Sequence, residues 1–321
     1  MKKLLFLMPL MAILIQGCGS GSKNKPVEKT NVSENSGTII INGSEVLFPL
    51  AMIWQQEFNK QYPKILIKNR ATGSDNSLKL LKADLIQIAM ISRELTVEEK
   101  QAGLYAVPVA IDAVLPVINF DNNYIEPVSM HGLPKKKLEG VFNGSIKTWG
   151  QLLGTKATDA IETFILPDTS GTSHTWADLL QMDVKKLRGT CLYDNLAMAN
   201  TITSKKFSLG YCSMSRIYSS KSGSRMGNLY VVPIDLNSNG QADDNELVLD
   251  KMDDLKAAIT AGKYPSPPVR SLYLVTKTAP KDAAIKAFLS WVVGPGQNYN
   301  IQAGLINIDK RTADKFVKMM Q

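Results

Sequence analysis

Residues 38–58 read TIIINGSEVLFPLAMIWQQEF, which predicts a β-strand, a short turn and a helix in immediate succession. The first four residues are rich in β-branched side chains, and Asn42-Gly43-Ser44 forms the turn. Pro49 stands in the expected first turn of the helix, a position that tolerates proline. The apolar residues of the helix recur at helical spacing: Leu47, Leu50, Ala51, Trp54 and Phe58. Strand, turn and helix in this order are the repeating unit of an α/β fold.

The same unit recurs along the chain. Further strands are predicted near residues 65–67, 84–91, 164–166, 209–212 and 229–234, and further helices near 76–82, 174–182, 283–293 and 312–320. Residues 107–119 form a long apolar stretch, and its Pro108 and Pro116 confine it to a strand edge or a crossing segment. A chain of 321 residues suits two lobes of roughly 100–200 residues each. The pattern predicts two α/β lobes with largely parallel sheets.

The composition excludes several classes of function. The chain is 44% hydrophobic and 21% charged, with a net charge of +8, and its lysines are scattered rather than interleaved with aromatic residues. A mild positive balance attracts anions, but this pattern predicts no nucleic-acid partner. His131 and His174 are the only histidines, which rules out a histidine-based zinc cluster. Ser170 and His174 stand too close together at a helix start to form a hydrolase elbow, so we predict no enzyme.

The N-terminus indicates export. Lys2-Lys3 precedes an apolar run from residue 4 to 15, and Gly17-Cys18 closes it. This run is too short to span a bilayer as a mature helix but suits a secretory signal. It resembles a bacterial lipobox, with residues 1–17 as signal peptide and Cys18 as the lipidated first mature residue; an ordinary leader with a chance cysteine is the alternative. Residues 18–36 are polar and predict a flexible tether, so membrane contact is expected through the lipid anchor only.

Two further cysteines, Cys191 and Cys212, fall near neighbouring predicted elements. An oxidising compartment outside the cytoplasm would allow them to pair. The sequence does not fix the distance between their Cα atoms, which decides whether a disulfide can form. A disulfide and two buried free thiols therefore both remain open.

Three turns that contain glycine and hydroxyl residues each precede a predicted helix: Gly43-Ser44, Thr72-Gly73-Ser74 and Thr169-Ser170-Gly171-Thr172. A helix N-terminus leaves backbone N–H groups without partners and has a partial positive charge. A hydroxyl adds a donor, and glycine lets the backbone approach a ligand, so such turns suit an oxyanion. The alternative for any one of them is a simple N-cap. Three in one chain favour an oxyanion site.

These turns belong to a series of motifs that resembles the phosphate-binding proteins of bacterial phosphate ABC transporters. The matching segments span about residues 38–308 and include INGS at 41–44, TGS at 72–74, SREL at 92–95, PVAIDAV at 108–114, GVFNGSI at 140–146, SGT at 170–172, LGY at 209–211 and FLSWV at 288–292. The resemblance implies a monomeric receptor with a two-lobed periplasmic-binding-protein fold, type II-like. Its lobes would close on inorganic phosphate or a similar oxyanion and present a surface to an ABC transporter permease.

We expect residues 37–112 and 230–321 to form lobe 1 and residues 113–229 to form lobe 2. The two crossing segments are expected near residues 107–119 and 207–234. Carried over residue by residue, the resemblance implies an anion held by Ser44, Ser74, Ser170, Gly171 and Thr172.

Two positions depart from the family pattern. Glu45 stands where the family usually has Thr or Ser, and Leu166 stands where it usually has an arginine. An arginine fork is a strong phosphate contact, so its loss implies a weaker site, a different anion, or a substitute cation such as Arg93 or Arg70. These departures also motivate a rival interpretation, a surface interaction or sensing protein that has kept the fold and lost its ligand. The family's proton-accepting carboxylate could be Asp75, Asp168 or Glu45, and the sequence does not choose among them.

Residues 235–246 read DLNSNGQADDNE and match the twelve-position calcium loop, with glycine at the sixth position. Ca²⁺ prefers six to eight oxygen ligands, and this spacing places them around one point. The preceding strand-like VVPI at 231–234 indicates an isolated structural loop rather than a helix–loop–helix hand. The alternative is a polar connection that only turns the chain. The predicted Ca²⁺ ligands are Asp235, Asn237, Asn239, Gln241, Asp243 and Glu246.

Overall fold

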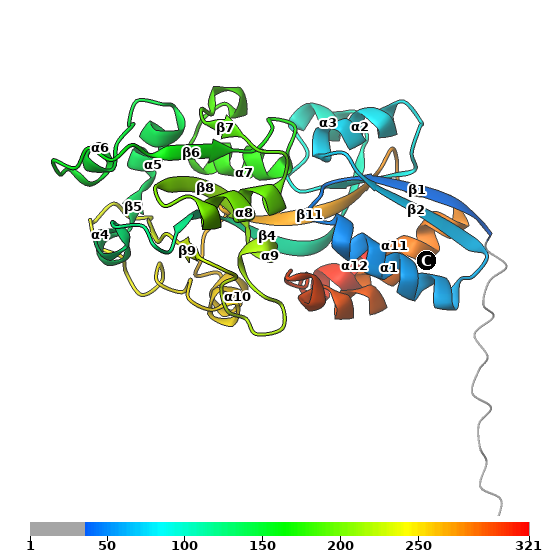
Figure 1. Cartoon of the computed structure of the whole chain (residues 1–321). Helices are drawn as coiled ribbons and strands as arrows, with labels where there is room; N and C mark the ends of the chain where they lie inside the picture. The colour runs from blue at the N-terminus through cyan, green and yellow to red at the C-terminus, as the bar shows by residue number, and fades with distance from the viewer. Residues whose placement is uncertain (1–35, 321) are drawn as a thin grey trace, which may run out of the picture. The chain divides into compact units, whose positions relative to one another are not determined.

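The computed structural model describes residues 36–320, which form two lobes joined side by side (Figure 1). The predicted signal peptide, the lipidation site Cys18 and almost the whole predicted tether lie outside the described residues. The strand β4 (Tyr105–Asn119) runs from one lobe into the other, next to β11 (Val269–Thr276). The two lobes therefore share a continuous sheet.

A nine-stranded sheet extends through the described residues. Besides β4 and β11 it contains β1 (Gly37–Gly43), β2 (Ile65–Ala71), β3 (Ile88–Ile91), β6 (Glu162–Ile165), β7 (Thr190–Cys191), β8 (Ser208–Ser213) and β9 (Leu229–Val231), while β5 (Leu133–Pro134) and β10 (Ile234–Asp235) pair separately. The order in the sheet is β2-β1-β3-β11-β4-β8-β6-β7, with β9 also paired to β4. The strands β1, β2 and β3 are parallel to each other, as are β6, β7 and β8, while β11 and β4 run antiparallel to their neighbours.

Helices pack around both halves of this sheet (Figure 1). The first half has α1 (Phe48–Gln61), α2 (Ser74–Lys82), α3 (Val97–Gln101), α11 (Ala283–Val293) and α12 (Lys310–Met320). The second half has α4 (Ile125–His131), α5 (Lys135–Phe142), α6 (Trp149–Leu153), α7 (Gly171–Leu179), α8 (Asn195–Ser204), α9 (Met214–Ile217) and α10 (Met252–Thr260). The predicted spacing in α1 is confirmed, because Leu50, Ala51, Trp54 and Phe58 are its buried residues.

The hydrophobic cores define lobe 1 as residues 37–112 with 269–320, and lobe 2 as residues 113–268. The expected assignment of residues 230–268 to lobe 1 is wrong. Val231, Leu249 and Leu255 pack in the same core as Val114 and Trp176 of lobe 2, so this stretch is an excursion of that lobe. The second crossing accordingly lies at the entrance to β11 and not at residues 207–234.

The strand β4 accommodates two prolines although it is central to the sheet. Pro108 pairs with Tyr273 at the point where the register between β4 and β11 shifts, which is the kind of irregularity that relieves a missing N–H donor. The carbonyl of Pro116 still accepts a hydrogen bond from the Val232 N–H at 3.0 Å. Residues up to Ala113 pair with β11, and residues from Val114 pair with β8 or β9. The strand thus belongs to both lobes.

Both described cysteines are free thiols. Cys191 lies on β7 and Cys212 on β8, and β6 separates the two strands in the sheet. Cys212 is buried, and burial raises the pKa of its thiol well above the ordinary range. The structure therefore has no disulfide between them, and the alternative of two buried free thiols is right for Cys212 only, because Cys191 is exposed.

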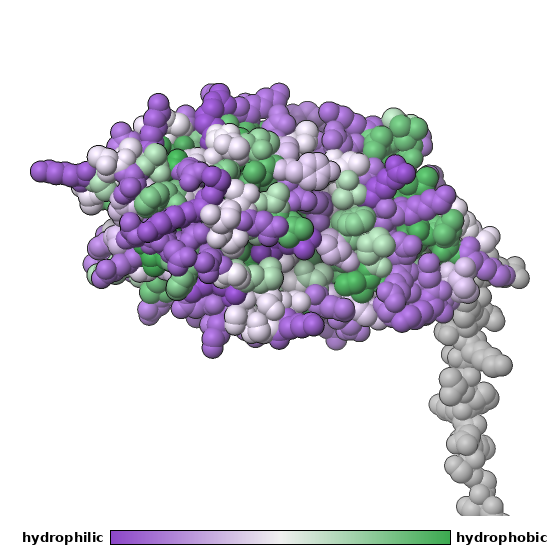
Figure 2. Space-filling view, in the orientation of Figure 1, coloured by the Kyte–Doolittle hydropathy of each residue, from purple (hydrophilic) through white to green (hydrophobic). Residues whose placement is uncertain are grey.

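The surface is mixed in character. On the face shown in Figure 2, hydrophilic residues predominate over lobe 2, and hydrophobic residues occur in small groups. Among the described residues, no helix has the length and apolar character needed to cross a membrane.

Candidate functional site

The first part of the site is a group of serine hydroxyls in lobe 1. Ser44 follows β1, Ser74 is the first residue of α2, and Ser92 follows β3. Because β1, β2 and β3 are parallel, the turns after them meet at one edge of the sheet. The Ser44 hydroxyl donates to Ser92 Oγ at 3.0 Å, and the Ser74 and Ser92 hydroxyls are 3.3 Å apart. All three are buried, so the structure gathers these hydroxyls at the junction between the lobes.

The second part is the Ser170-Gly171-Thr172 turn of lobe 2. The Ser170 hydroxyl caps α7 by accepting a hydrogen bond from the Thr172 N–H at 3.2 Å. A Cβ atom at Gly171 would lie only 2.3 Å from Ser92 Oγ and 2.7 Å from the Ser92 carbonyl oxygen. Only glycine permits this approach between the lobes. The structure therefore brings this turn and the lobe 1 hydroxyls together, and their binding of an oxyanion stays a prediction.

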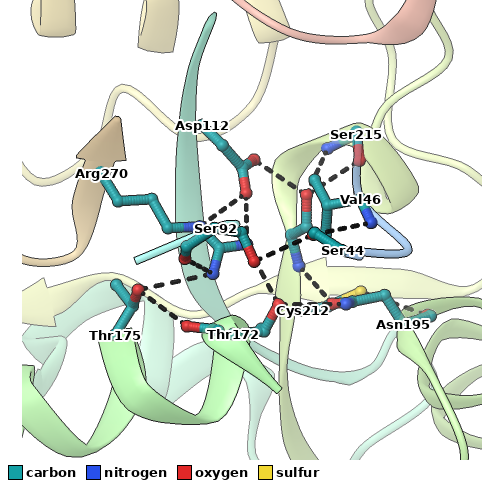
Figure 3. A network of polar contacts seen from close by, with 12 residues as sticks. Ser44, Val46, Ser92, Asp112, Thr172, Thr175, Asn195, Cys212, Ser215 and Arg270 are labelled. Atoms are coloured by element: carbon teal, nitrogen blue, oxygen red, sulfur yellow. Dashed lines mark hydrogen bonds and ion pairs between the residues drawn. The ribbon is translucent and has the colours of Figure 1, made fainter. Parts of the chain in front are cut away.

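The third part is Arg270, which the sequence analysis did not identify. Its guanidinium donates to Asp112 Oδ2 from Nε at 3.0 Å and from Nη2 at 2.6 Å (Figure 3). It also donates to the Ser92 carbonyl at 2.8 Å and to Thr172 Oγ1 at 3.0 Å. Arg270 and Asp112 face each other in the register of β11 and β4, where the chain crosses between lobes. Arg270 thus brings a buried cation to the Ser92 carbonyl of lobe 1 and to the Thr172 hydroxyl of lobe 2.

Leu166, where the family usually has an arginine, is a core residue of lobe 2. Its backbone N–H donates to the Tyr211 hydroxyl at 3.0 Å, and the Ser173 hydroxyl donates to its carbonyl at 3.0 Å. Arg270 reaches the site from a different strand.

The suggested substitute cations are engaged elsewhere. Arg93 donates to Asp75 Oδ1 at 2.7 Å and to Glu99 Oε2 at 2.8 Å, and these two carboxylates raise its pKa against the opposing effect of burial. His174 of lobe 2 lies 3.0 Å from Asp75 Oδ2. Burial opposes ionisation of Asp75, but His174 and Arg93 outweigh it and lower the pKa of the carboxyl below its ordinary value. Asp75 and Arg93 therefore stabilise the contact between the lobes next to the serine hydroxyls.

The remaining suggested cation, Arg70, lines a separate hollow with Lys68 and Asn69. The hydrolase arrangement is also not assembled. His174 bonds to Asp75, while the Ser170 hydroxyl lies 3.5 Å from Glu45 Oε1.

Glu45 is the candidate carboxylate that faces the site. Its Oε1 accepts a hydrogen bond from Asn195 Nδ2 at 2.8 Å, in addition to the contact with Ser170. Asn195 also donates to Thr172 Oγ1 at 3.1 Å and accepts a bond from the Ser213 N–H. Sequence reasoning missed Asn195, because a polar residue at a helix start is ordinarily part of a cap. Its buried amide links both lobes across the site.

The family model described as a PBP superfamily domain matches residues 28–295. The chain belongs to the periplasmic-binding-protein (PBP) superfamily. It is 28% identical over 192 residues to the phosphate-binding protein PstS of Pseudomonas aeruginosa, which is 53% of this chain and 58% of that protein. It is 23% identical over 225 residues to PstS of Bacillus subtilis, covering 68% and 72% of the two chains. The chain thus spans less than two thirds of the length of the Pseudomonas relative.

Solved structures share the fold. A substrate-binding protein from Clostridium perfringens with bound phosphate matches with a TM-score of 0.67 and 20% identity, covering 85% of this chain and 100% of that one. An ABC-type phosphate transport receptor from Vibrio cholerae matches with a TM-score of 0.62 and 18% identity, covering 84% and 100%. The predicted α/β periplasmic-binding-protein fold is confirmed. The PstS relatives are named as phosphate-binding proteins.

Proposed function

We propose that the protein captures phosphate or a similar oxyanion between its lobes and delivers it to an ABC transporter permease. The observation that carries this proposal is the meeting of hydroxyl-bearing turns from both lobes next to Arg270. The guanidinium donates to the backbone carbonyl of Ser92 in lobe 1 at 2.8 Å and to the hydroxyl of Thr172 in lobe 2 at 3.0 Å. The Ser92 hydroxyl itself lies with those of Ser44 and Ser74. An oxyanion at this place would bond to both lobes at once.

The electrostatics of the site support a ligand held by neutral donors together with one balanced cation. Asp112 already neutralises the charge of Arg270, so the arginine contributes directed hydrogen-bond donors more than net positive charge. The N-terminal turns of α2 and α7 add partial positive charge from the aligned peptide dipoles. Hydroxyl and amide donors can form several short bonds to the oxygens of a tetrahedral anion. Such a site supports capture of an anion and its later release.

Lobe closure follows from the same contacts. The bonds from Arg270 to Thr172 and from Ser170 to Glu45 join residues of different lobes. A ligand that bonds to both lobes favours their closed arrangement, which is how hinged binding proteins respond to ligand. We propose that the closed form is the one presented to the permease by a monomeric receptor.

The place of action is part of the proposal. A leader of residues 1–17 would export the chain, and a lipid on Cys18 would anchor it to the outer face of a bacterial membrane. Labelling cells with a radioactive or clickable fatty acid tests this. The wild-type protein is expected to incorporate the label, and Cys18→Ser is expected not to; label retained in Cys18→Ser would contradict the anchor.

Calorimetry tests the anion site. Ser74→Ala and Thr172→Ala should each weaken phosphate binding by about 1–3 kcal/mol, because each removes a hydroxyl from the site. Ser204→Ala, at the exposed end of α8, serves as the matched control and should bind like the wild type. Unchanged affinity in both site variants would overturn the assignment.

A thermal-shift screen separates this proposal from its rival. A receptor gains stability with the anion that it binds, by mass action. Phosphate, sulfate, molybdate and arsenate at millimolar concentration are the appropriate panel. A shift with none of them would favour a surface interaction or sensing protein that has kept the fold without the ligand.

We also propose that the loop at 235–246 binds Ca²⁺ as a structural ion. Asp235 is buried and accepts bonds from the N–H groups of Asn239 and Gly240 at 3.1 and 3.0 Å, and Gly240 has φ 78°. Glu246 accepts from the Leu236 and Asp243 N–H groups. Within residues 36–320, no three His, Cys, Asp or Glu side chains are already grouped to hold a metal. Binding would therefore require these side chains to turn inward to a common point.

Thermal unfolding with calcium tests this second proposal. The wild type should gain stability as Ca²⁺ rises and gain little with Mg²⁺, which demands a tighter octahedral shell. Glu246→Gln should lose most of the effect, because one of the charged oxygen ligands is removed. A wild-type protein indifferent to Ca²⁺ would leave the loop as a polar connection.

A further inference from the structure

A cavity of about 370 Å³ opens between the lobes beside the hydroxyl site. Its lining includes Glu45, Thr72, Asn76, Ser170, Tyr193 and Asp194. Glu45 and Ser170 also belong to the hydroxyl site, so the cavity and the site share a wall. Pockets for small organic ligands are commonly roughly 300–1,000 Å³, and a single inorganic phosphate would leave most of this one empty. The space suits the organic substituent of a ligand whose phosphoryl group lies in the adjoining hydroxyl site.

The charge of this cavity is unusual for a site that takes anions. Its described lining contains two carboxylates, Glu45 and Asp194, and no lysine, arginine or histidine. Among the ion pairs of the described residues, none involves Glu45, whose bonds come from the neutral Asn195 and Ser170. Oδ1 of Asp194 caps α8 at the Ala197 N–H. A bare oxyanion next to Glu45 would meet an uncompensated like charge.

An aromatic ring stands at the rim of the same cavity. Tyr193 is 85% exposed, and it directly precedes Asp194 in the chain. An exposed aromatic face beside carboxylates is a common setting for an organic ammonium group, since the ring face attracts cations. The side chains of the lining therefore offer two kinds of attraction to a positive group, whereas the only attraction to a negative group comes from the helix N-termini at Gly73 and Ser170.

We propose that the ligand is a zwitterionic organophosphorus compound, a phosphate monoester or phosphonate whose short substituent ends in an ammonium group. This rests on the proposed function, because the phosphoryl group is assigned to the hydroxyl site, whose Ser170 also lines the cavity. The ammonium group lies in the cavity, where it neutralises Glu45 and faces Asp194 and Tyr193. Glu45 then determines specificity, because its negative charge disfavours a free oxyanion and favours an oxyanion whose substituent carries a positive charge.

Calorimetry with three probes tests the proposal on the full-length mature protein. The probes are phosphoethanolamine, glycerol 3-phosphate, which replaces the ammonium by neutral hydroxyls, and inorganic phosphate. The wild type should bind phosphoethanolamine at least about tenfold more tightly than either of the others, which corresponds to about 1.4 kcal/mol. Glu45→Gln should remove most of that preference and bind inorganic phosphate more tightly than the wild type does.

Two more variants test the second carboxylate and provide a control. Asp194→Asn removes the second carboxylate but keeps a residue that caps helices well, so it should reduce the preference for phosphoethanolamine without loss of folding. Glu126→Gln, an exposed carboxylate on α4, is the matched control and should leave all three affinities unchanged. The proposal is overturned if wild-type protein binds phosphoethanolamine no more tightly than glycerol 3-phosphate, or if Glu45→Gln keeps the preference.

The outcomes also separate this proposal from the proposed function. Tight binding of inorganic phosphate alone would overturn the zwitterionic ligand and leave the oxyanion receptor standing. If the protein binds none of the three probes and no other oxyanion, both proposals are overturned.

Discussion

Replacing Arg270 with methionine keeps an apolar stem at the junction but removes the guanidinium. Asp112 is 0% exposed and would lose both bonds from Arg270 to its Oδ2 atom. The Ser213 hydroxyl would remain, donating to Oδ1 at 2.8 Å. A buried carboxylate would thus keep its charge with one neutral partner in place of a cation.

The size of the effect follows from this loss. Removing one partner of a buried ion pair costs about 3–5 kcal/mol, because the other charge is left uncompensated. Domains of ordinary stability unfold with a free energy of about 5–15 kcal/mol, so Arg270→Met should remove a large part of the total. The double variant Arg270→Met with Asp112→Leu leaves no unpaired charge and should recover most of the loss.

Equilibrium unfolding in urea, followed by the fluorescence of the four tryptophans, measures these differences. Lys277→Met is the control, because its pair with Asp84 is exposed and should contribute little. If Arg270→Met lowers the free energy of unfolding by less than about 1 kcal/mol, or if the double variant is as unstable as the single one, the reasoning about the buried pair fails.

Three further outcomes are expected. Tyr211→Phe should lower the free energy of unfolding by about 1–3 kcal/mol in urea, because the Leu166 N–H would be buried without an acceptor; an unchanged midpoint would contradict this. Gly171→Ala should weaken oxyanion binding more than tenfold by calorimetry while unfolding changes little, since the added Cβ would collide with Ser92; equal affinity would count against closure at this contact. The stability that ionised Asp75 provides should be complete above its ordinary pKa of 3.8 and should disappear as pH falls through the lower folded pKa, so urea curves of the wild type and Asp75→Asn should converge in acid. A constant difference down to pH 2 would exclude that linkage.

The sequence predicted the local features of the site well, because these depend on short segments. The turns at Ser44, Ser74 and Ser170 were found from glycine and hydroxyl residues between a strand and a helix. The helices after two of these turns begin earlier than expected, at Ser74 and Gly171 rather than near residues 76 and 174. The turn residues therefore lie in the first turn of each helix, where backbone N–H groups point outward.

The pairing of Arg270 with Asp112 could not be predicted, because it joins residues 158 positions apart. It depends on β11 entering the sheet between β3 and β4, which no local pattern encodes. A signal was nevertheless present, since each residue is a lone charge within an apolar strand. The lobe boundary was missed for the same kind of reason. The strands β8 and β9 look suitable for a crossing, but both pair with the second half of β4 and remain in lobe 2.

The position of β11 has a consequence for the order in which the chain can fold. Lobe 2 is one uninterrupted stretch of sequence, from residue 113 to 268, so all its strands are available before β11 is made. Lobe 1 cannot complete its part of the sheet until β11 is made, because β11 lies between β3 and β4. A chain that emerges from its N-terminus can therefore complete its second lobe first, and the first lobe last. Arg270 lies on that last strand, so the proposed binding site is assembled only after β11 has been made.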